Sequence, residues 1–261
     1  MIKKIIKRLR GGWKRRRFHL ANWSNAAVPV HNISWLPDGF QVRKLAATGV
    51  SLIDNFCTHE EAQAVIDSSK DKVRRSRVLV DGKFEDSPGR ISDTAMMFGA
   101  NYRDESLFPL MQRAAMLVGI PYTHLEDVYV TRYGEGGLYN EHLDFGDEYQ
   151  VDRLYTVLLY LNSVPAEQGG ATVFPKLKTA VQPVAGRAVT WTNKNPDGSG
   201  HFENSHAAYP VKNGGEKWVI QFWFRRYPMV AAIGDLAVPQ ARQGQAIDPQ
   251  TELPAGVTLH Q

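Results

Sequence analysis

A histidine and an aspartate stand two residues apart, as His142 and Asp144, at the end of the stretch from Tyr133. In an extended chain, residues i and i+2 point to the same face, so this pair would present an imidazole and a carboxylate to one point in space. These are two of the three groups in the two-histidine, one-carboxylate ligand set of non-haem iron sites. The pair alone is weak evidence, because two polar residues on a solvent-facing strand look the same.

A third ligand would have to come from another segment of the chain. After Asp144 the sequence offers only His201, His206 and His260. His201 falls in a polar loop and His260 lies next to the C-terminus, whereas His206 begins an extended run and is flanked by small residues. His206 is therefore the preferred third ligand. Taken singly, each of these residues would more often be a hydrogen-bonded core, turn or strand-edge residue.

A lysine follows His206 by eleven residues and begins an alternating strand pattern. One face of this strand would carry Lys217, Val219, Gln221 and Trp223, and the other face Trp218, Ile220, Phe222 and Phe224. A cation that projects into an apolar interior is costly unless an anion pairs with it, and a carboxylate of a bound small molecule would be such an anion. The alternative is a lysine on a solvated strand face, where most lysines lie.

The elements that must position these residues change type along the chain. Two helices are expected early, at Thr58–Ser69 after a T-x-x-E capping box and at Asp104–Val118. Later strands are expected at Leu125–Tyr133, Leu154–Leu161, Arg187–Thr192, Ser205–Val211 and Lys217–Arg225. This order predicts an α+β, mainly β fold in which the N-terminal helices pack on one face of an antiparallel double sheet.

Two turn sequences predict hairpins. Asp81-Gly82 would join a strand ending at Val80 to one starting at Lys83. Lys212-Asn-Gly-Gly215 would join the last two strands in the same way. Both predictions rest on local turn chemistry.

Composition describes a globular chain long enough for a sizeable core, with 43% hydrophobic and 10% aromatic residues. The single cysteine, Cys57, excludes an intrachain disulfide framework and a thiolate metal cluster. No apolar run approaches the length of a transmembrane segment, so none is expected.

The net charge of +4 hides a basic arm. Residues 1–17 carry nine Lys and Arg and no acidic residue, which leaves the rest of the chain with a net charge of −5. The arm has no apolar stretch of the kind that a signal peptide needs after its charges, and a cytoplasmic location is expected. The arm is either a partner for an anionic membrane surface or nucleic acid, or a solvated tail.

Four spaced motifs resemble the prolyl 4-hydroxylase family of 2-oxoglutarate/Fe(II) dioxygenases. In chain order they are Tyr133-x8-His142-x-Asp144, Gly169-Gly170-Ala171-Thr172, His206-x3-Pro210-Val211 and Gly215-x-Lys217-Trp218. The resemblance covers roughly Asp54 to Arg225 and implies a double-stranded β-helix, or jelly-roll, core. It divides the chain into a basic arm and lead-in at 1–38, a dioxygenase domain at 39–227 with its catalytic core at about 124–225, and a loosely packed C-terminal extension at 228–261.

The resemblance also implies roles for individual residues. The iron ligands would be His142, Asp144 and His206. The 2-oxoglutarate site would contain Lys217, which pairs with the distal carboxylate, together with Tyr133 and Thr172. Positions near the substrate would be Arg90, Asp93, Tyr139 and Trp223.

The activity implied is a hydroxylation of an unactivated C–H bond that consumes O2 and 2-oxoglutarate, releases succinate and CO2, and uses ascorbate (vitamin C) as a further cofactor. The substrate would be a prolyl or other residue of a peptide or protein. Two alternatives stay open. One is a hydroxylase of a free amino acid or natural product. The other is a catalytically silent jelly-roll binding protein that acts through its basic arm.

Overall fold

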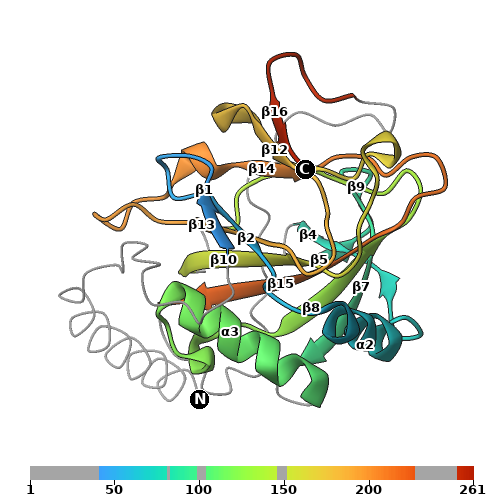
Figure 1. Ribbon diagram of the computed structural model, residues 1–261, viewed down its shortest axis with the longest axis horizontal. Coiled ribbons are helices and arrows are strands. Elements are labelled where there is room, and N and C mark those ends of the chain that lie inside the picture. The colour runs from blue at the N-terminus through green and yellow to red at the C-terminus, as the bar shows by residue number, and fades with distance from the viewer. Residues whose placement is uncertain (1–40, 81–82, 99–103, 146–151, 227–251) are drawn as a thin grey trace, which may run out of the picture.

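The computed structural model describes residues 41–80, 83–98, 104–145, 152–226 and 252–261. The basic arm, the lead-in and residues 228–251 of the C-terminal extension lie outside the described residues. Within the described part, two β-sheets face each other and two α-helices cover the outer face of one of them (Figure 1). This arrangement confirms the predicted α+β, mainly β class.

The larger sheet has eight strands in the order β1-β2-β13-β10-β15-β8-β7-β3. Its strands are β1 (Gln41–Lys44), β2 (Ser51–Asp54), β3 (Arg74–Arg75), β7 (Asp93–Phe98), β8 (Val128–Tyr133), β10 (Arg153–Tyr160), β13 (Ala188–Thr192) and β15 (Lys217–Arg225). All neighbouring pairs are antiparallel. Every residue of β10 is buried, as its apolar run predicts for a strand covered on both faces.

The smaller sheet has six strands in the order β16-β12-β11-β14-β9-β6. Its strands are β6 (Arg90–Ile91), β9 (Leu138–His142), β11 (Thr172–Phe174), β12 (Thr179–Val181), β14 (His206–Ala208) and β16 (Thr258–His260). A separate hairpin, β4 (Val78–Val80) with β5 (Lys83–Glu85), confirms the first hairpin prediction, because Val80 pairs with Lys83.

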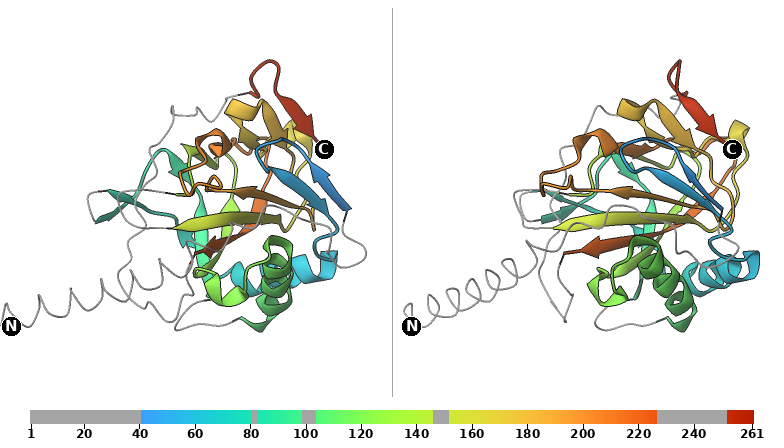
Figure 2. Two further views of the ribbon diagram at one scale, coloured as in Figure 1. Left: turned by 90° about the vertical axis from the view of Figure 1, so that its left-hand side faces the viewer. Right: turned by 60° about the vertical axis from the view of Figure 1, so that its left-hand side comes forward.

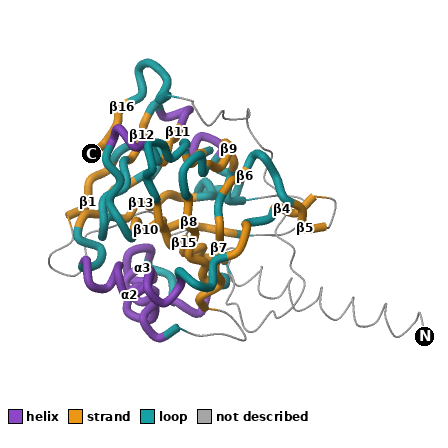
Figure 3. The backbone as a smooth tube through the Cα atoms, turned by 90° about the vertical axis from the view of Figure 1, so that its right-hand side faces the viewer, coloured by secondary structure: helices purple, strands orange, loops and turns teal. Residues whose placement is uncertain are grey.

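Two helices cover the outer face of the larger sheet (Figures 2 and 3). They are α2 (His59–Ser69) and α3 (Phe108–Val118), and the short 3-10 helices are Glu105–Leu107, Tyr122–His124, Ala166–Gln168, Pro175–Leu177 and Phe202–Asn204. The predicted capping box opens α2: the backbone N–H of Glu61 donates to Oγ1 of Thr58 at 3.2 Å, and that of Thr58 donates to the Glu61 carboxylate at 2.9 Å. In the described part of the chain, no helix is both long and apolar enough to span a membrane.

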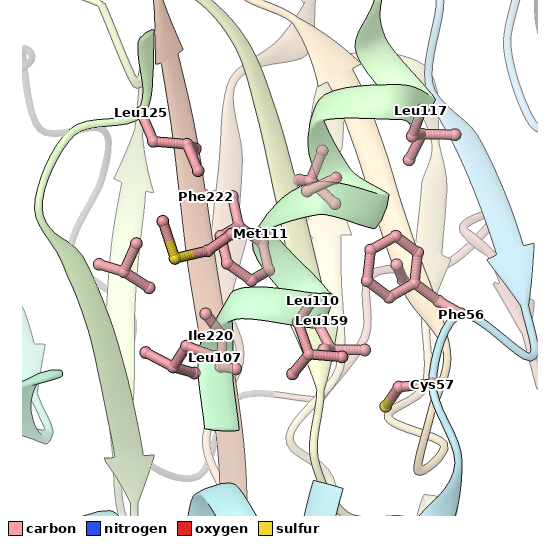
Figure 4. Close-up of a cluster of buried hydrophobic side chains, with 14 of the residues drawn as sticks. Phe56, Cys57, Leu107, Leu110, Met111, Leu117, Leu125, Leu159, Ile220 and Phe222 are labelled. Atoms are coloured by element: carbon pink, nitrogen blue, oxygen red, sulfur yellow. The ribbon is translucent and has the colours of Figure 1, made fainter. Parts of the chain in front are cut away.

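The helices pack against β15 and its neighbours through a shared apolar core (Figure 4). Leu110 and Met111 of α3 lie over Ile220 and Phe222 of β15. Val219, which alternates with them, lies instead in the core between the two sheets. The predicted alternation of β15 is confirmed. One face of the larger sheet holds the helices, and the other faces the smaller sheet.

The second hairpin prediction is wrong. β14 pairs with β9 and β11, whereas β15 pairs with β10 and β8 in the other sheet. The chain does turn at the predicted place, where the N–H of Gly215 donates to the carbonyl of Lys212 at 2.9 Å. A turn sequence reports a local reversal of the chain, and here the reversal carries the chain from one sheet to the other.

The end of the C-terminal extension is not loosely packed. Residues of β16 pair in parallel with β12, from Thr179 with Thr258 to Val181 with His260. Three apolar side chains of this segment pack on the outer face of the smaller sheet: Leu253, Val257 and Leu259. The polar, proline-rich composition of the extension concealed this short apolar alternation.

Gly169 and Gly136 provide a matched test of how closely the backbone at Gly169 approaches Pro210. Both have a left-handed backbone, with φ of +68° and +72°, but a Cβ on Gly169 would lie 2.3 Å from the carbonyl oxygen of Pro210, whereas one on Gly136 would meet nothing within 4 Å. We expect Gly136→Ala to lower the free energy of unfolding by about 1 kcal/mol and Gly169→Ala by roughly 3 kcal/mol. Urea denaturation followed by circular dichroism measures both, and equal losses would contradict the close approach.

Candidate active site

Two histidines and one aspartate meet between the sheets. His142 ends β9, and His206 begins β14 directly opposite it. With Asp144, they are all buried, and their ligand atoms lie within 4.8 Å of one another. The Nε2 atoms of His142 and His206 are 3.8 Å and 3.7 Å from carboxylate oxygens of Asp144. This arrangement could hold one metal ion.

Both imidazoles are held in the tautomer that a metal needs. Nδ1 of His142 lies 2.8 Å from the carbonyl oxygen of Asn140, and Nδ1 of His206 lies 3.1 Å from that of Asn204. A carbonyl oxygen only accepts, so Nδ1 carries the hydrogen and Nε2 offers a lone pair. Burial and the neighbouring His206 lower the pKa of His142 to about 3, which keeps its ring neutral.

The carboxylate of Asp144 is held by a chain of polar groups. Oγ1 of Thr156 donates to its Oδ2 at 2.6 Å, and Nδ2 of Asn193 donates to Oγ1 of Thr156 at 3.0 Å. Arg153 donates to the backbone carbonyl of Asp144 at 3.2 Å. Burial raises the pKa of Asp144, but the two histidines, Arg153 and the Thr156 hydrogen bond together bring it below the usual value. The group is therefore an anion.

Sequence reasoning missed Thr156, Asn193 and Arg153. A signal for Thr156 was present, because it is the one hydroxyl residue without an aromatic ring in the apolar run Leu154–Leu161. A buried hydroxyl needs a hydrogen-bond partner, and its partner here is the metal-facing carboxylate. The other two residues carry no comparable signal, since their contacts depend on how the sheets face each other.

Lys217 is a buried lysine that has no carboxylate partner in the described part of the chain. Its side chain is 1% exposed, and Nζ donates to the carbonyl oxygen of Gly170 at 2.8 Å. Nζ also lies 4.6 Å from the ring centre of Tyr133, the residue opposite it on β8. Within the described residues no carboxylate pairs with it, and burial lowers the pKa of Lys217 to about 7.

Tyr133 and Thr172, the other two residues predicted to contact 2-oxoglutarate, are also buried. Burial raises the pKa of Tyr133 to about 12, so its hydroxyl keeps its hydrogen. Thr172, on β11, accepts a hydrogen bond from the hydroxyl of Tyr160 at 2.8 Å. Tyr160 was not foreseen, although it lies on the same face of β10 as Thr156.

The four residues predicted near the substrate separate into two groups. The ring of Tyr139 stacks on His142, with ring centres 3.8 Å apart, and the guanidinium of Arg90 lies 4.9 Å from the Tyr139 ring centre. Trp223 lies opposite Thr156 in the sheet. The structure brings these three residues to the site.

Asp93 is not brought to the site. It pairs with Arg132, whose nearest nitrogen is 3.5 Å from its carboxylate. Arg132 lies opposite Trp218, on the helix-side face of the sheet. Strand alternation turns this face away from Lys217, so the side chain of Asp93 faces away from the site.

Comparison with known proteins agrees with this geometry. The family model for the 2OG-Fe(II) oxygenase superfamily matches residues 128–225, which contain all three metal-facing residues and Lys217. This part of the chain is similar to the 2OG-Fe(II) oxygenase superfamily. Members of this superfamily use Fe(II) and 2-oxoglutarate, and the donor set of two imidazoles, one carboxylate and a nearby unpaired ammonium fits both groups.

Among relatives, this chain is similar to prolyl 4-hydroxylase subunit alpha-1 of Gallus gallus, at 35% identity over 65% of this chain and 34% of that protein. It is also similar to subunit alpha-2 of Caenorhabditis elegans, at 32% identity over 66% of this chain and 33% of that protein. The chain thus spans about a third of the length of these curated relatives.

Solved structures confirm the jelly-roll prediction. The viral collagen prolyl hydroxylase of Paramecium bursaria Chlorella virus-1, solved with 2-oxoglutarate, matches with a TM-score of 0.55 and 26% identity over 69% of this chain and 97% of that one. A prolyl hydroxylase of Trichoplax adhaerens matches with a TM-score of 0.55 and 19% identity over 82% and 93% of the two chains, and shows the shared fold.

Thr156 and Thr190 provide a matched test of whether the hydrogen bond to the Asp144 carboxylate assists metal binding. Both hydroxyls are buried, but Thr190 donates to the backbone carbonyl of Thr156 at 2.9 Å rather than to the carboxylate. We expect Thr156→Val to weaken Fe(II) binding about tenfold, since a supporting hydrogen bond orients a metal ligand. Thr190→Val should lower stability without that loss. Anaerobic Fe(II) titration measures the affinities, and equal weakening in both variants would contradict a specific role for Thr156.

Proposed function

We propose that the chain is a 2-oxoglutarate- and Fe(II)-dependent dioxygenase that hydroxylates an unactivated C–H bond, on a prolyl or other residue of a peptide or protein. One observation carries this proposal: three neutral or anionic metal donors, and one lysine that pairs with no carboxylate among the described residues, are buried between the two sheets. Burial of such groups is costly without ligands that neutralise them. A metal ion and a dicarboxylate together would do so.

The metal would be held by the three converging side chains. His142 and His206 supply neutral Nε2 donors, and Asp144 supplies an anionic oxygen. Fe(II) and 2-oxoglutarate bound there would activate O2, so that one of its oxygen atoms enters the substrate and the other enters succinate, with release of CO2. The protein orients the ligands through the carbonyls of Asn140 and Asn204 and keeps water away from them by burial.

Lys217 would hold 2-oxoglutarate by its distal carboxylate, the one farther from the metal. Its ammonium lies beside the ring of Tyr133, and Thr172 of the facing sheet accepts a hydrogen bond from Tyr160 on β10, the strand next to β15. A carboxylate placed here would accept charge-assisted hydrogen bonds from Lys217 and the Tyr133 hydroxyl. Before 2-oxoglutarate binds, the carbonyl oxygen of Gly170 holds Nζ of Lys217 in position, because it accepts one of the three ammonium hydrogens.

A peptide substrate is supported by the relatives and by the side chains beside His142. The relatives are named as prolyl hydroxylases, and one of them as a collagen prolyl hydroxylase. Arg90, Tyr139 and Trp223 offer a guanidinium and two aromatic rings next to the metal-facing residues, which suits a ring such as that of proline. A free amino acid or natural product is the second candidate, because the same three groups would also hold a small ring that bears a carboxylate.

Two measurements test the reaction class. Anaerobic addition of Fe(II) and 2-oxoglutarate should produce the visible metal-to-ligand charge-transfer band, and His142→Ala should abolish it. Succinate release over proline-rich peptides, and then over free amino acids, identifies the substrate class. A protein that binds neither Fe(II) nor 2-oxoglutarate would instead support the silent binding protein.

Lys217 gives a pH-dependent signature of 2-oxoglutarate binding. With a pKa of about 7, it is mostly neutral at pH 8 before binding. A bound carboxylate raises that pKa, so the complex should take up most of one proton at pH 8 and almost none well below pH 7. Calorimetric titration in buffers of different ionisation enthalpy measures this uptake.

Two variants separate the charge of Lys217 from its titration. Lys217→Arg is charged at every pH used, so it should bind 2-oxoglutarate without proton uptake. Lys217→Met should bind at least about a hundredfold more weakly, because the distal carboxylate loses its buried partner. Unchanged proton uptake in Lys217→Arg would show that another group titrates.

Other expectations from the sequence stay proposals. They are a contact of residues 1–17 with an anionic surface, stimulation by ascorbate, a cytoplasmic location, and the boundaries of the three segments. Vesicle binding with and without residues 1–17, turnover with and without ascorbate, and cell fractionation test the first three. Limited proteolysis tests the last.

A further inference from the structure

The backbone turn that holds Lys217 is built from two consecutive glycines. The carbonyl oxygen of Gly170 accepts from Nζ of Lys217 at 2.8 Å, and Gly169 precedes it. Both glycines have a positive φ, of +68° at Gly169 and +75° at Gly170. Because glycine has no Cβ to restrict its backbone, local sterics leave the direction of the Gly170 carbonyl poorly determined. Contacts from other segments must therefore fix it.

The peptide group between the two glycines is held at both ends. Its N–H, which belongs to Gly170, donates to the carbonyl oxygen of Pro210 at 2.9 Å. Its oxygen, which belongs to Gly169, accepts from Nε2 of Gln182 at 2.7 Å. The first contact joins two backbone groups, whereas the second depends on the side chain of one residue. Gln182 is therefore the anchor that a substitution can remove.

Gln182 directly follows β12 and is buried, with 5% of its surface exposed. Its Nε2 also donates to the carbonyl oxygens of Val164 at 2.7 Å and Pro165 at 3.3 Å. Its own backbone N–H donates to the carbonyl oxygen of His260 on β16 at 2.9 Å. One buried amide thus ties the segment before the glycines to the glycines themselves, and the C-terminal strand holds the residue that carries it.

We propose that Gln182 is a positioning residue for 2-oxoglutarate: its amide fixes the Gly169–Gly170 turn, and the Gly170 carbonyl then holds Nζ of Lys217 where the distal carboxylate binds. This inference rests on the proposed dioxygenase function and adds a residue that acts on the site only through the backbone of the turn. Without the amide, the carbonyl oxygens of Val164 and Gly169 lose a buried donor. The turn should then shift toward other donors, and the ammonium with it.

The test compares 2-oxoglutarate with 2-oxobutyrate, a 2-oxo acid that lacks the distal carboxylate. Each acid is titrated without O2 into the Fe(II)-loaded full chain, and the visible charge-transfer band reports binding. Gln182→Met removes the donor and keeps a side chain of similar length. It should weaken 2-oxoglutarate binding about tenfold, the loss expected for a disturbed hydrogen bond to a charged group, and 2-oxobutyrate binding less than about twofold.

Three more variants isolate the route through Lys217. Gln182→Met added to Lys217→Met should not weaken 2-oxoglutarate binding further, because both substitutions act on the same contact. Gln182→Asn shortens the reach of the amide by one methylene and should show the same pattern more weakly, which covers a failure of Gln182→Met to fold. Thr179→Val is the matched control on β12: this buried hydroxyl donates to the carbonyl oxygen of Leu177 at 3.3 Å, so both affinities should stay unchanged.

The outcomes separate this inference from the function on which it rests. An unmutated protein that binds Fe(II) but neither 2-oxo acid would overturn the dioxygenase function, and the role of Gln182 with it. If the unmutated protein prefers 2-oxoglutarate to 2-oxobutyrate, the function stands, and equal weakening of both acids in Gln182→Met would overturn the positioning role alone. A further loss when Gln182→Met is added to Lys217→Met would also overturn it, since the effect would then not pass through the ammonium.

Discussion

Burial of charged and polar groups between the two sheets is the constraint on which the site depends. Asp144 and Lys217 are both nearly inaccessible to water, yet they do not pair with each other. The anion is stabilised by a threonine, an arginine and two histidines, whereas the cation has a carbonyl oxygen and an aromatic ring. The free energy of the site is therefore lowest when a bound metal cation faces Asp144 and a bound carboxylate faces Lys217. Ligand affinity and the cost of the open site therefore have the same physical origin.

The two faces of β15 have different roles: one packs in the apolar core, and the other carries polar side chains toward the site. The helix-side residues Ile220 and Phe222 lie in the apolar core that α3 covers. The opposite face carries Lys217, Gln221 and Trp223, and Lys217 donates from there to the carbonyl oxygen of Gly170 in the loop before β11. Because the side chains alternate along one rigid strand, the packing that fixes the first set also fixes the second. The apolar core thus sets the positions of groups that it does not touch.

The sequence predicted those features that depend on local spacing. The capping box of α2, the alternation of β15 and the shared direction of His142 and Asp144 all follow from periodicity within one segment. Choosing His206 required elimination among the remaining histidines, and the spaced motifs of a known family made that choice firm. Apart from the choice of His206, these predictions are determined by neighbours along the chain.

Features that depend on register between distant strands could not be foreseen. Thr156 holds Asp144 only because β10 crosses the site at that residue, and Asp93 faces away only because it pairs with Arg132. The failed hairpin at Lys212–Gly215 has the same cause, since a turn sequence does not say which sheet the next strand joins. A shift of one residue in β15 would exchange its two faces and place Gln221 among the helices. The register of β15 therefore decides which of its side chains face the site, and the apolar face of the strand holds that register in place.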